Sequence, residues 1–179
     1  MILPEHKLVI SEEQIRHRIP RLAKEIAADL GDSNPLIVVI LKGAFIFASD
    51  LVRNFDFPYQ IDFISTSSYG TDTKSSGIVK ILKDLDEPIK NRTLLFVEDI
   101  VDTGLTLHYL IEMLKIREPK RIEIATFLSK PSRREFHPEV KYVGFEIDDR
   151  FVVGYGLDYQ QQYRGLPYVI AIDEATSGE

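Results

Sequence analysis

Two adjacent carboxylates and a turn of small residues follow an apolar run in the middle of the chain. Residues 94–106 read LLFVEDIVDTGLT, in which Glu98 and Asp99 are the paired acids and Asp102 opens the turn. The apolar run has no polar alternation, which is typical of a strand buried on both faces of a parallel sheet. Carboxylates accept hydrogen bonds from sugar hydroxyls and bind magnesium through oxygen and water. The pattern therefore predicts that acids after a buried strand bind a cation or a sugar.

The turn after the acids has the composition of a phosphate site. From Gly104 onward apolar residues recur at helical spacing, which predicts that a helix begins as the strand ends. The first N–H groups of a helix lack intrahelical partners and the helix dipole is positive there, so residues 102–106 could bind a phosphate dianion. Gly104 allows close approach of the backbone, and Thr103 and Thr106 add hydroxyl donors. The plainer alternative is that Asp102 or Thr103 only caps the helix while the paired acids are solvated.

The first helix is expected over residues 11–30. Ser11 and Gln14 fit a capping box, and an apolar stripe at helical spacing follows them. Pro20 should kink this helix or remove one of its hydrogen bonds, and Gly31 should end it.

Alternating strands and helices position the polar residues. Residues 36–41 form an apolar run typical of a buried strand, Lys42 and Gly43 break it, and helical spacing follows over residues 44–52. Further strands are predicted near residues 59–66, 78–83, 121–128 and 141–147. The pattern indicates an α/β fold with a doubly wound, mainly parallel sheet of about five strands and flanking helices. Ligands of such sheets bind beyond the carboxyl ends of the strands, where Lys42 and Asp99 both fall.

Composition narrows the class of protein. The 179 residues are expected to form one domain, and their 44% hydrophobic and 28% charged content is ordinary for a soluble globular protein. Lys plus Arg number 22 against 28 Asp plus Glu, and the net charge of -6 argues against nucleic-acid binding. No cysteine occurs, no apolar run approaches a membrane span, and no G-x-G-x-x-G of a dinucleotide-dependent dehydrogenase follows a strand. A cytoplasmic enzyme without a membrane segment is the simplest interpretation.

At residues 94–106 the chain resembles the phosphoribosyltransferase family, whose motif for phosphoribosyl pyrophosphate is an apolar strand, two acids and a D-T-G-x-T type loop. Further segments resemble successive signatures of hypoxanthine-guanine phosphoribosyltransferases, in the same order: LKGAF at 41–45, SSYG at 67–70, VKILKDLD at 79–86, SKPSRR at 129–134 and FVVGYGLDYQQQYRGLP at 151–167. The resemblance implies a type I fold with a small hood built from the N- and C-terminal segments. It implies Mg²⁺-dependent transfer of phosphoribose to N9 of a 6-oxopurine base, giving a purine nucleoside monophosphate (IMP or GMP) and pyrophosphate, by a homodimer or homotetramer.

The resemblance also implies roles for individual residues. Asp102 would be the general base, taking the purine proton near N7. Phosphoribosyl pyrophosphate would contact Lys42, Gly43, Ser68, Tyr69, Glu98, Asp99, Asp102, Thr103, Gly104, Leu105, Thr106 and Arg164. The purine would contact Lys130, Phe151, Val152 and Asp158, and Mg²⁺ would be held by Glu98, Asp99 and Asp158.

For some of these residues the family pattern also implies the individual contact that each would make. Lys130 would donate to the 6-oxo group, Phe151 would stack on the base, and Arg164 would bind pyrophosphate. The peptide bond from Leu41 to Lys42 is expected to be cis. The polar segment at residues 67–77 is expected to be mobile without ligand and to close over the reacting centre.

Several alternatives remain open at this point. Taken singly, Phe151 fits a core residue, Lys130 a surface charge, and Asp158 with Arg164 a surface ion pair. Leu105 stands where relatives often carry a polar or charged residue, and Arg150 stands where relatives vary. A xanthine-preferring enzyme and a nucleotide-sensing regulator on the same fold are the rival functions.

Overall fold

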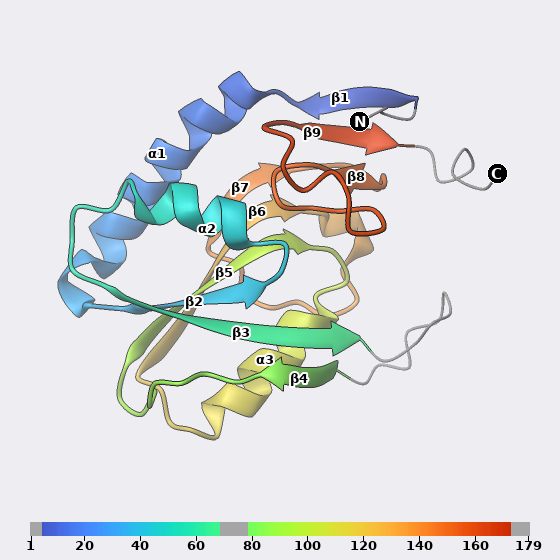
Figure 1. Ribbon diagram of the computed structural model, residues 1–179. Coiled ribbons are helices and arrows are strands. Elements are labelled where there is room, and N and C mark those ends of the chain that lie inside the picture. Colours follow the sequence, from blue (N-terminus) through green and yellow to red (C-terminus); the bar gives the residue numbers. More distant parts are fainter. Residues whose placement is uncertain (1–4, 69–78, 173–179) are drawn as a thin grey trace.

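The computed structural model of the chain describes residues 5–68 and 79–172 (Figure 1). Its helices are α1 (Glu12–Leu30), α2 (Phe45–Val52) and α3 (Leu105–Lys115), with short 3-10 turns η1 (Gly31–Ser33) and η2 (Pro131–Arg133). Its strands are β1 (His6–Ile10), β2 (Leu36–Leu41), β3 (Gln60–Ser68), β4 (Val79–Lys83), β5 (Thr93–Val101), β6 (Arg121–Ser129), β7 (Tyr142–Glu146), β8 (Val152–Val153) and β9 (Val169–Ile172). No helix among these residues is long and apolar enough to cross a membrane.

The main sheet has six strands in the order β4-β3-β2-β5-β6-β7. Five of them are parallel, which confirms the predicted mainly parallel sheet, while the strand expected near 78–83 is the antiparallel edge strand β4. β3 lies on one side of β2 and β5 on the other, so the direction of winding reverses between β2 and β5. Ligand sites of doubly wound sheets lie at such a reversal, beyond the carboxyl ends of the strands.

Both faces of the main sheet are covered. α1 and α2 lie over one face and α3 over the other (Figure 1). In β2, Ile37 and Val39 belong to the core under α1 and α2, whereas Leu36 and Val38 belong to the core that α3 closes. Because successive side chains of a strand point to opposite faces, a strand covered twice must be apolar throughout. This is why the apolar runs marked β2 and β5 in the sequence.

The capping box predicted for α1 is confirmed. The N–H of Gln14 donates to Ser11 Oγ at 3.2 Å, and the N–H of Ser11 donates to Gln14 Oε1 at 2.8 Å. Pro20 lies inside α1, which runs as a single helix to Leu30, and Gly31 opens the turn η1. The helix tolerates Pro20 because α1 buries a continuous apolar face against the sheet.

A second, three-stranded antiparallel sheet joins the two ends of the described chain in the order β1-β9-β8. It lies near the end of the main sheet toward which the parallel strands point (Figure 1). This is the hood that the family resemblance implies, and it places residues 151–168 beside the carboxyl ends of β2 and β5.

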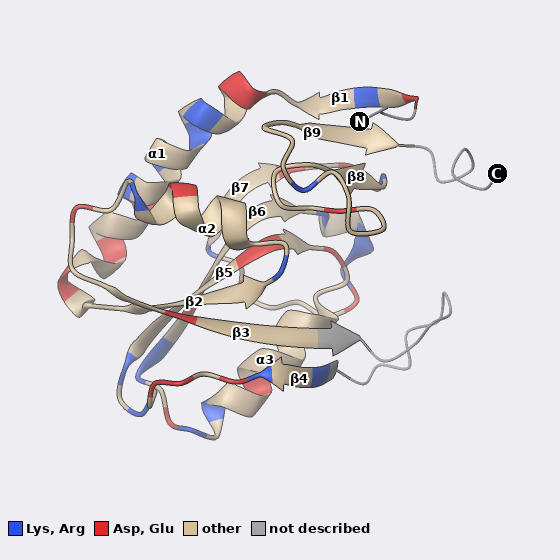
Figure 2. Ribbon diagram, in the orientation of Figure 1, with Lys and Arg blue, Asp and Glu red and all other residues tan. Residues whose placement is uncertain are grey.

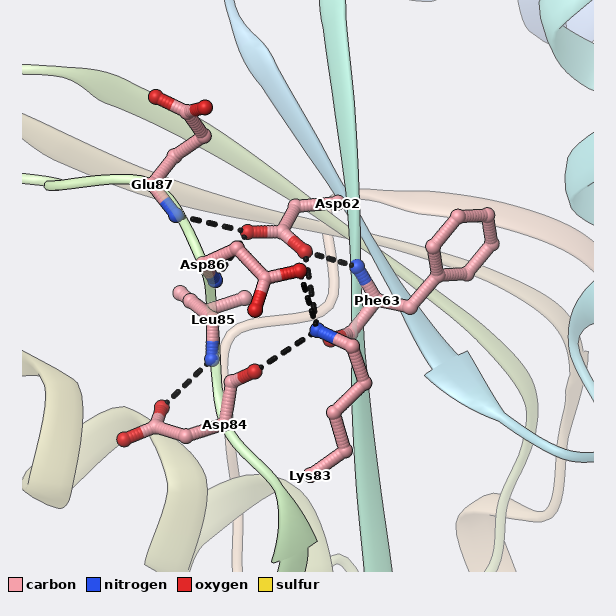
Figure 3. A network of polar contacts seen from close by, with 7 residues as sticks. All are labelled: Asp62, Phe63, Lys83, Asp84, Leu85, Asp86 and Glu87. Atoms are coloured by element: carbon pink, nitrogen blue, oxygen red, sulfur yellow. Dashed lines mark hydrogen bonds and ion pairs between the residues drawn. The ribbon is translucent and has the colours of Figure 1, made fainter.

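The connection from β4 to β5 is anchored on a buried carboxylate of β3 (Figure 3). Asp62 is 4% exposed and accepts hydrogen bonds from the N–H groups of Phe63, Asp86 and Glu87 and from Lys83 Nζ. Burial raises the pKa of Asp62, but these donors outweigh it and hold the pKa below its ordinary value. The anchor is therefore satisfied and fixes the segment that leads into β5.

Candidate active site

The paired acids lie within β5 rather than after it. The sequence pattern placed the end of the strand near Val97, but β5 continues to Val101 because Glu98, Ile100 and Val101 still pair with β6. Glu98 is 8% exposed, and within the described residues its Oε2 atom has no hydrogen-bond partner. The alternative that these acids are solvated loop residues is therefore excluded for Glu98.

Burial changes the protonation of this pair. Burial raises the pKa of Glu98 well above its ordinary value, and the neighbouring charge of Asp99 raises it further. Burial also raises the pKa of Asp99 to about 6, although the N–H of Ile100, 2.8 Å from Asp99 Oδ1, partly opposes the shift. A buried acid next to a partly buried one, with few donors between them, destabilises the free protein, and a cation would relieve the repulsion between the two carboxylates.

The unfavourable burial of the Glu98 carboxylate leads to a testable expectation for Glu98→Gln. The folded protein holds the Glu98 proton more tightly than the unfolded chain, so wild-type stability should fall as pH rises above the ordinary carboxyl pKa of 4.5. The variant lacks this titration. We expect it to be more stable than wild type by about 1–3 kcal/mol at pH 8, and we expect the gain to shrink toward pH 4. Urea unfolding of the ligand-free protein across this range measures the difference.

Glu123→Gln is the matched control for that experiment. Its carboxylate is also largely buried, but it accepts a hydrogen bond from Arg121 Nε at 2.6 Å. Removing a paired carboxylate should lower stability instead of raising it. Equal effects of the two substitutions would contradict the assignment of Glu98 as an unsatisfied buried acid.

The turn after β2 meets the paired acids. The predicted cis peptide bond between Leu41 and Lys42 is confirmed. The basic turn and the acidic end of β5 lie side by side (Figure 2). Gly43 packs so closely on β5 that a Cβ added to it would lie 1.5 Å from Asp99 Oδ2. The carbonyl of Gly43 in turn packs on Gly156, where an added Cβ would lie 2.0 Å from that oxygen.

The loop after β8 places a second cationic side chain, Arg164, near Asp99 and the turn at Lys42. Arg164 Nη2 lies 2.7 Å from Asp158 Oδ1, Arg164 Nη1 donates to the carbonyl of Gly156 at 2.8 Å, and the charge of Arg164 lowers the pKa of Asp99 against the larger effect of burial. Gln161 was missed in the sequence, yet its Oε1 lies 3.3 Å from Arg164 Nη2 and 3.5 Å from Lys42 Nζ. Gln161 also has a positive φ of 64°, an uncommon backbone conformation that a sequence pattern does not reveal.

Asp158 and Arg164 therefore form an ion pair, but it is not the surface pair named as an alternative, because both side chains are largely buried and both charges act on Asp99. Among residues 5–68 and 79–172, no group of three His, Cys, Asp or Glu side chains is placed to hold a metal ion by itself.

The turn at residues 102–106 has the predicted form of a helix start. Gly104 is the N-cap of α3 with φ of 83°, a left-handed conformation that favours glycine. The N–H of His108 donates to the carbonyl of Gly104 at 2.9 Å as the first bond of the helix. The amides of Thr106 and Leu107 precede that bond, so they have no partner within the helix and can donate hydrogen bonds to an anion. Thr103 Oγ1 accepts from the N–H of Leu105 at 3.4 Å, which holds the turn together.

A pocket of about 540 Å³ joins this turn to the hood. Its lining includes the predicted residues Asp102, Lys130 and Phe151 and three side chains that sequence reasoning did not assign to the site, Arg133, Asp149 and Arg150. Lys130 is 7% exposed, which excludes the alternative of a surface lysine, and its Nζ lies 3.7 Å from both Asp102 Oδ2 and Asp149 Oδ1. Arg133 pairs with the same two acids, at 3.2 Å from Asp102 Oδ1 and 3.5 Å from Asp149 Oδ2.

The aromatic wall of this pocket comes from the hood. Phe151 is partly buried, packs on the hood core and meets the Tyr159 ring edge-on at a centroid distance of 5.6 Å. Val152 is buried in β8, so only its main chain could reach a ligand. A cation, a carboxylate and a ring around one pocket fit a planar, polar-edged heterocycle.

Two predicted residues cannot be placed as side chains. Ser68 ends β3, where its backbone pairs with Val79, but its side chain is outside the described part, and Tyr69 lies wholly outside the described residues with most of the polar segment at 67–77. The signals that could have marked Arg133 and Asp149 are weak, because Arg133 ends the short turn η2, Asp149 lies between β7 and β8, and only tertiary packing brings the two together.

Most of the chain is similar to known phosphoribosyltransferases, in agreement with the resemblance seen in its motifs. The phosphoribosyl transferase domain family matches residues 11–160. The chain is 48% identical over 163 residues to the hypoxanthine-guanine phosphoribosyltransferase of Bacillus subtilis, which covers 91% of both chains. It is 47% identical over 173 residues to the hypoxanthine phosphoribosyltransferase of Salmonella typhimurium, covering 94% of this chain and 97% of that protein.

A solved structure of a hypoxanthine-guanine phosphoribosyltransferase from Bacillus anthracis superposes with a TM-score of 0.89 at 43% identity, covering 94% of this chain and 100% of that one. The likeness to these enzymes therefore covers both the sequence and the fold over most of the chain. The chain belongs to the phosphoribosyltransferase family, among its hypoxanthine-guanine phosphoribosyltransferases.

Proposed function

We propose that this chain transfers the phosphoribosyl group of phosphoribosyl pyrophosphate to N9 of hypoxanthine or guanine, giving IMP or GMP and pyrophosphate in cytoplasmic purine salvage. The observation that carries this proposal is the buried Lys130 beside Asp102 at the wall of the pocket. N7 and the 6-oxo group are neighbouring positions on one edge of a 6-oxopurine. A lysine and a carboxylate 3.7 Å apart can therefore donate to the oxygen and accept the N7 proton together.

The other residues of the site divide the remaining tasks. Phe151 offers its ring to one face of the base, and the turn at residues 102–106 holds the 5′-phosphate through its amides. Lys42 and Arg164 neutralise the departing pyrophosphate, and the planar fork of arginine suits two phosphate oxygens. Positive charge builds up on carbon 1 of the ribose as its bond to pyrophosphate breaks, and the new bond to N9 removes that charge. Positioning and charge stabilisation are therefore the main contributions of the protein.

Magnesium fits the acid pair. In nucleotide enzymes Mg²⁺ is usually bound by one or two carboxylates, waters and substrate phosphates. Glu98 supplies a buried carboxylate oxygen without a partner among the described residues, and Asp99 lies against Gly43, the residue after Lys42. Glu98 and Asp99 would hold the ion. Asp158 is paired with Arg164, so it could bind the ion only if that ion pair broke. The bound ion would neutralise charge on the pyrophosphate leaving group.

The exposed apolar side chains support an oligomer. Phe45 is 45% exposed on α2, and Ile61 and Phe63 are 43% and 37% exposed on β3. Ile61 and Phe63 lie on the same face of β3, because side chains alternate along a strand, and large exposed apolar side chains gathered on one face are typical of contact surfaces. We infer a homodimer or homotetramer.

Nucleotide formation from phosphoribosyl pyrophosphate with hypoxanthine, guanine or xanthine tests the function. We expect Mg²⁺-dependent formation of IMP and GMP, a much lower rate with xanthine, and loss of the reaction when EDTA removes the metal. A faster reaction with xanthine would favour the xanthine-preferring alternative. Tight nucleotide binding without turnover of any base would favour a nucleotide-sensing regulator.

A further inference from the structure

A short segment after η2 donates hydrogen bonds to the backbone of the turn at residues 102–106, which we call the phosphate turn. We call residues 134–136 the carbonyl strap, because they donate hydrogen bonds to two successive carbonyls of the turn. Arg134 Nη1 donates to the carbonyl of Asp102 at 2.6 Å. The N–H groups of Glu135 and Phe136 donate to the carbonyl of Thr103 at 3.1 and 2.9 Å. The strap leaves no room beside the turn, since a Cβ on Gly104 would lie 2.4 Å from the carbonyl oxygen of Phe136.

Holding these carbonyls sets the direction of the amides. In a trans peptide unit the C=O and N–H bonds are coplanar and point in opposite directions. When the carbonyls of Asp102 and Thr103 are drawn toward the strap, the N–H groups of Thr103 and Gly104 must point away from it. Consecutive amides on one side of a turn form an anion-binding nest, and here they continue into the free amides at the start of α3.

Arg134 is an unfavourable choice for a purely structural role, because its charge is partly buried and, in the described part of the chain, is not paired with an opposite charge. It is partly buried, and among the described residues it forms no ion pair, because its guanidinium donates to the neutral carbonyl of Asp102 and to Ser129 Oγ at 2.9 Å. Burial lowers its pKa, opposed by the charge of Asp102. Its bond to Ser129, the last residue of β6, ties the turn to the rigid sheet, and its positive charge lies behind the place where an anion would bind.

We propose that Arg134 is a positioning residue that orients the amides of the turn at residues 102–106 toward the 5′-phosphate without contacting the nucleotide. This inference rests on the proposed phosphate site. It assigns the strap a role in recognising the phosphate, separate from the roles of Lys130 and Asp102 toward the base.

The contribution of the 5′-phosphate to binding can be measured directly as the ratio of the dissociation constants of inosine and IMP. Arg134→Ala should lower this ratio by about 10- to 100-fold, the range expected for one hydrogen bond from a charged group. Inosine affinity should change little. Guanidinium ion added to Arg134→Ala should restore part of the ratio, and Arg134→Lys, which keeps the charge and one donor, should lie between wild type and the alanine variant.

Arg18→Ala is the matched control, because Arg18 is also partly buried and donates to two backbone carbonyls, those of Val143 and Gly144, far from the turn. It should lower thermal stability without changing the inosine/IMP ratio. If Arg134→Ala does not fold, the same measurements on Arg134→Lys decide the question.

The possible outcomes separate the two proposals. If wild-type protein binds inosine as tightly as IMP, the proposed phosphate site fails. If wild type strongly prefers IMP and the Arg134 variants keep that preference, or lose affinity for inosine and IMP equally, the positioning role of Arg134 is wrong.

Discussion

Asp102→Asn should lower kcat by about 10²- to 10⁴-fold, the range typical of losing a general base. The side chain keeps its size, so Lys130 and Arg133 can still contact its oxygen, but the amide no longer accepts the N7 proton. IMP affinity should stay within a few-fold of wild type because the amides of the phosphate turn are unchanged. Single-turnover measurements with hypoxanthine and phosphoribosyl pyrophosphate separate the chemical step from product release.

Asp149→Asn is a close control. Asp149 lies in the same pocket and pairs with the same two cations, Lys130 and Arg133, at 3.7 and 3.5 Å. Its loss perturbs the charges of the pocket about as much, but it removes no proposed base. We expect less than a tenfold change in kcat. Equal losses in the two variants would mean that the charge network, and not a proton acceptor at Asp102, determines the rate.

Gly43→Ala should reduce kcat/KM for phosphoribosyl pyrophosphate by about 100-fold or more, since a displacement of about 1 Å at a reacting centre can have that effect. The new methyl group would lie 1.5 Å from Asp99 Oδ2 and 2.4 Å from Asp99 Cγ, so the carboxylate must rotate out of its place. The proposed magnesium and pyrophosphate contacts would be lost together. KM for hypoxanthine should change much less, because the base pocket is lined by other elements.

Gly165→Ala controls for the loss of glycine itself, because a Cβ at Gly165 meets no atom within 4 Å. A double-mutant cycle tests the mechanism further. If Gly43→Ala acts by displacing Asp99, it should have little added effect in an Asp99→Ala background. Fully additive losses would show that the turn at Lys42 matters for a reason other than its contact with β5.

Much of the fold follows from local patterns in the chain. The capping box at Ser11 and Gln14, the unbroken apolar runs of β2 and β5 and the Gly104 turn are each determined by neighbours a few residues apart. The cis peptide before Lys42 and the hood were expected only through the family's motifs. The antiparallel direction of β4 and the continuation of β5 through Glu98 could not be read locally, because pairing with β3 and β6 determines them.

In the candidate site, too, some features follow from local sequence and others only from tertiary packing. The residue types and their order along the chain indicated a sugar-phosphate site, because buried strands, paired acids and helix starts have short-range signatures. Only the tertiary structure decided that Lys130 is buried against Asp102, that Gln161 lies between Lys42 and Arg164, and that Arg134 reaches the turn. The contacts of Lys130 with Asp102, of Arg134 with Asp102 and of Gln161 with Lys42 join residues 28, 32 and 119 positions apart, so they arise from the packing of the sheet and hood. Sequence periodicity reports which face of an element is buried, and it carries no information about which distant loop will meet that element.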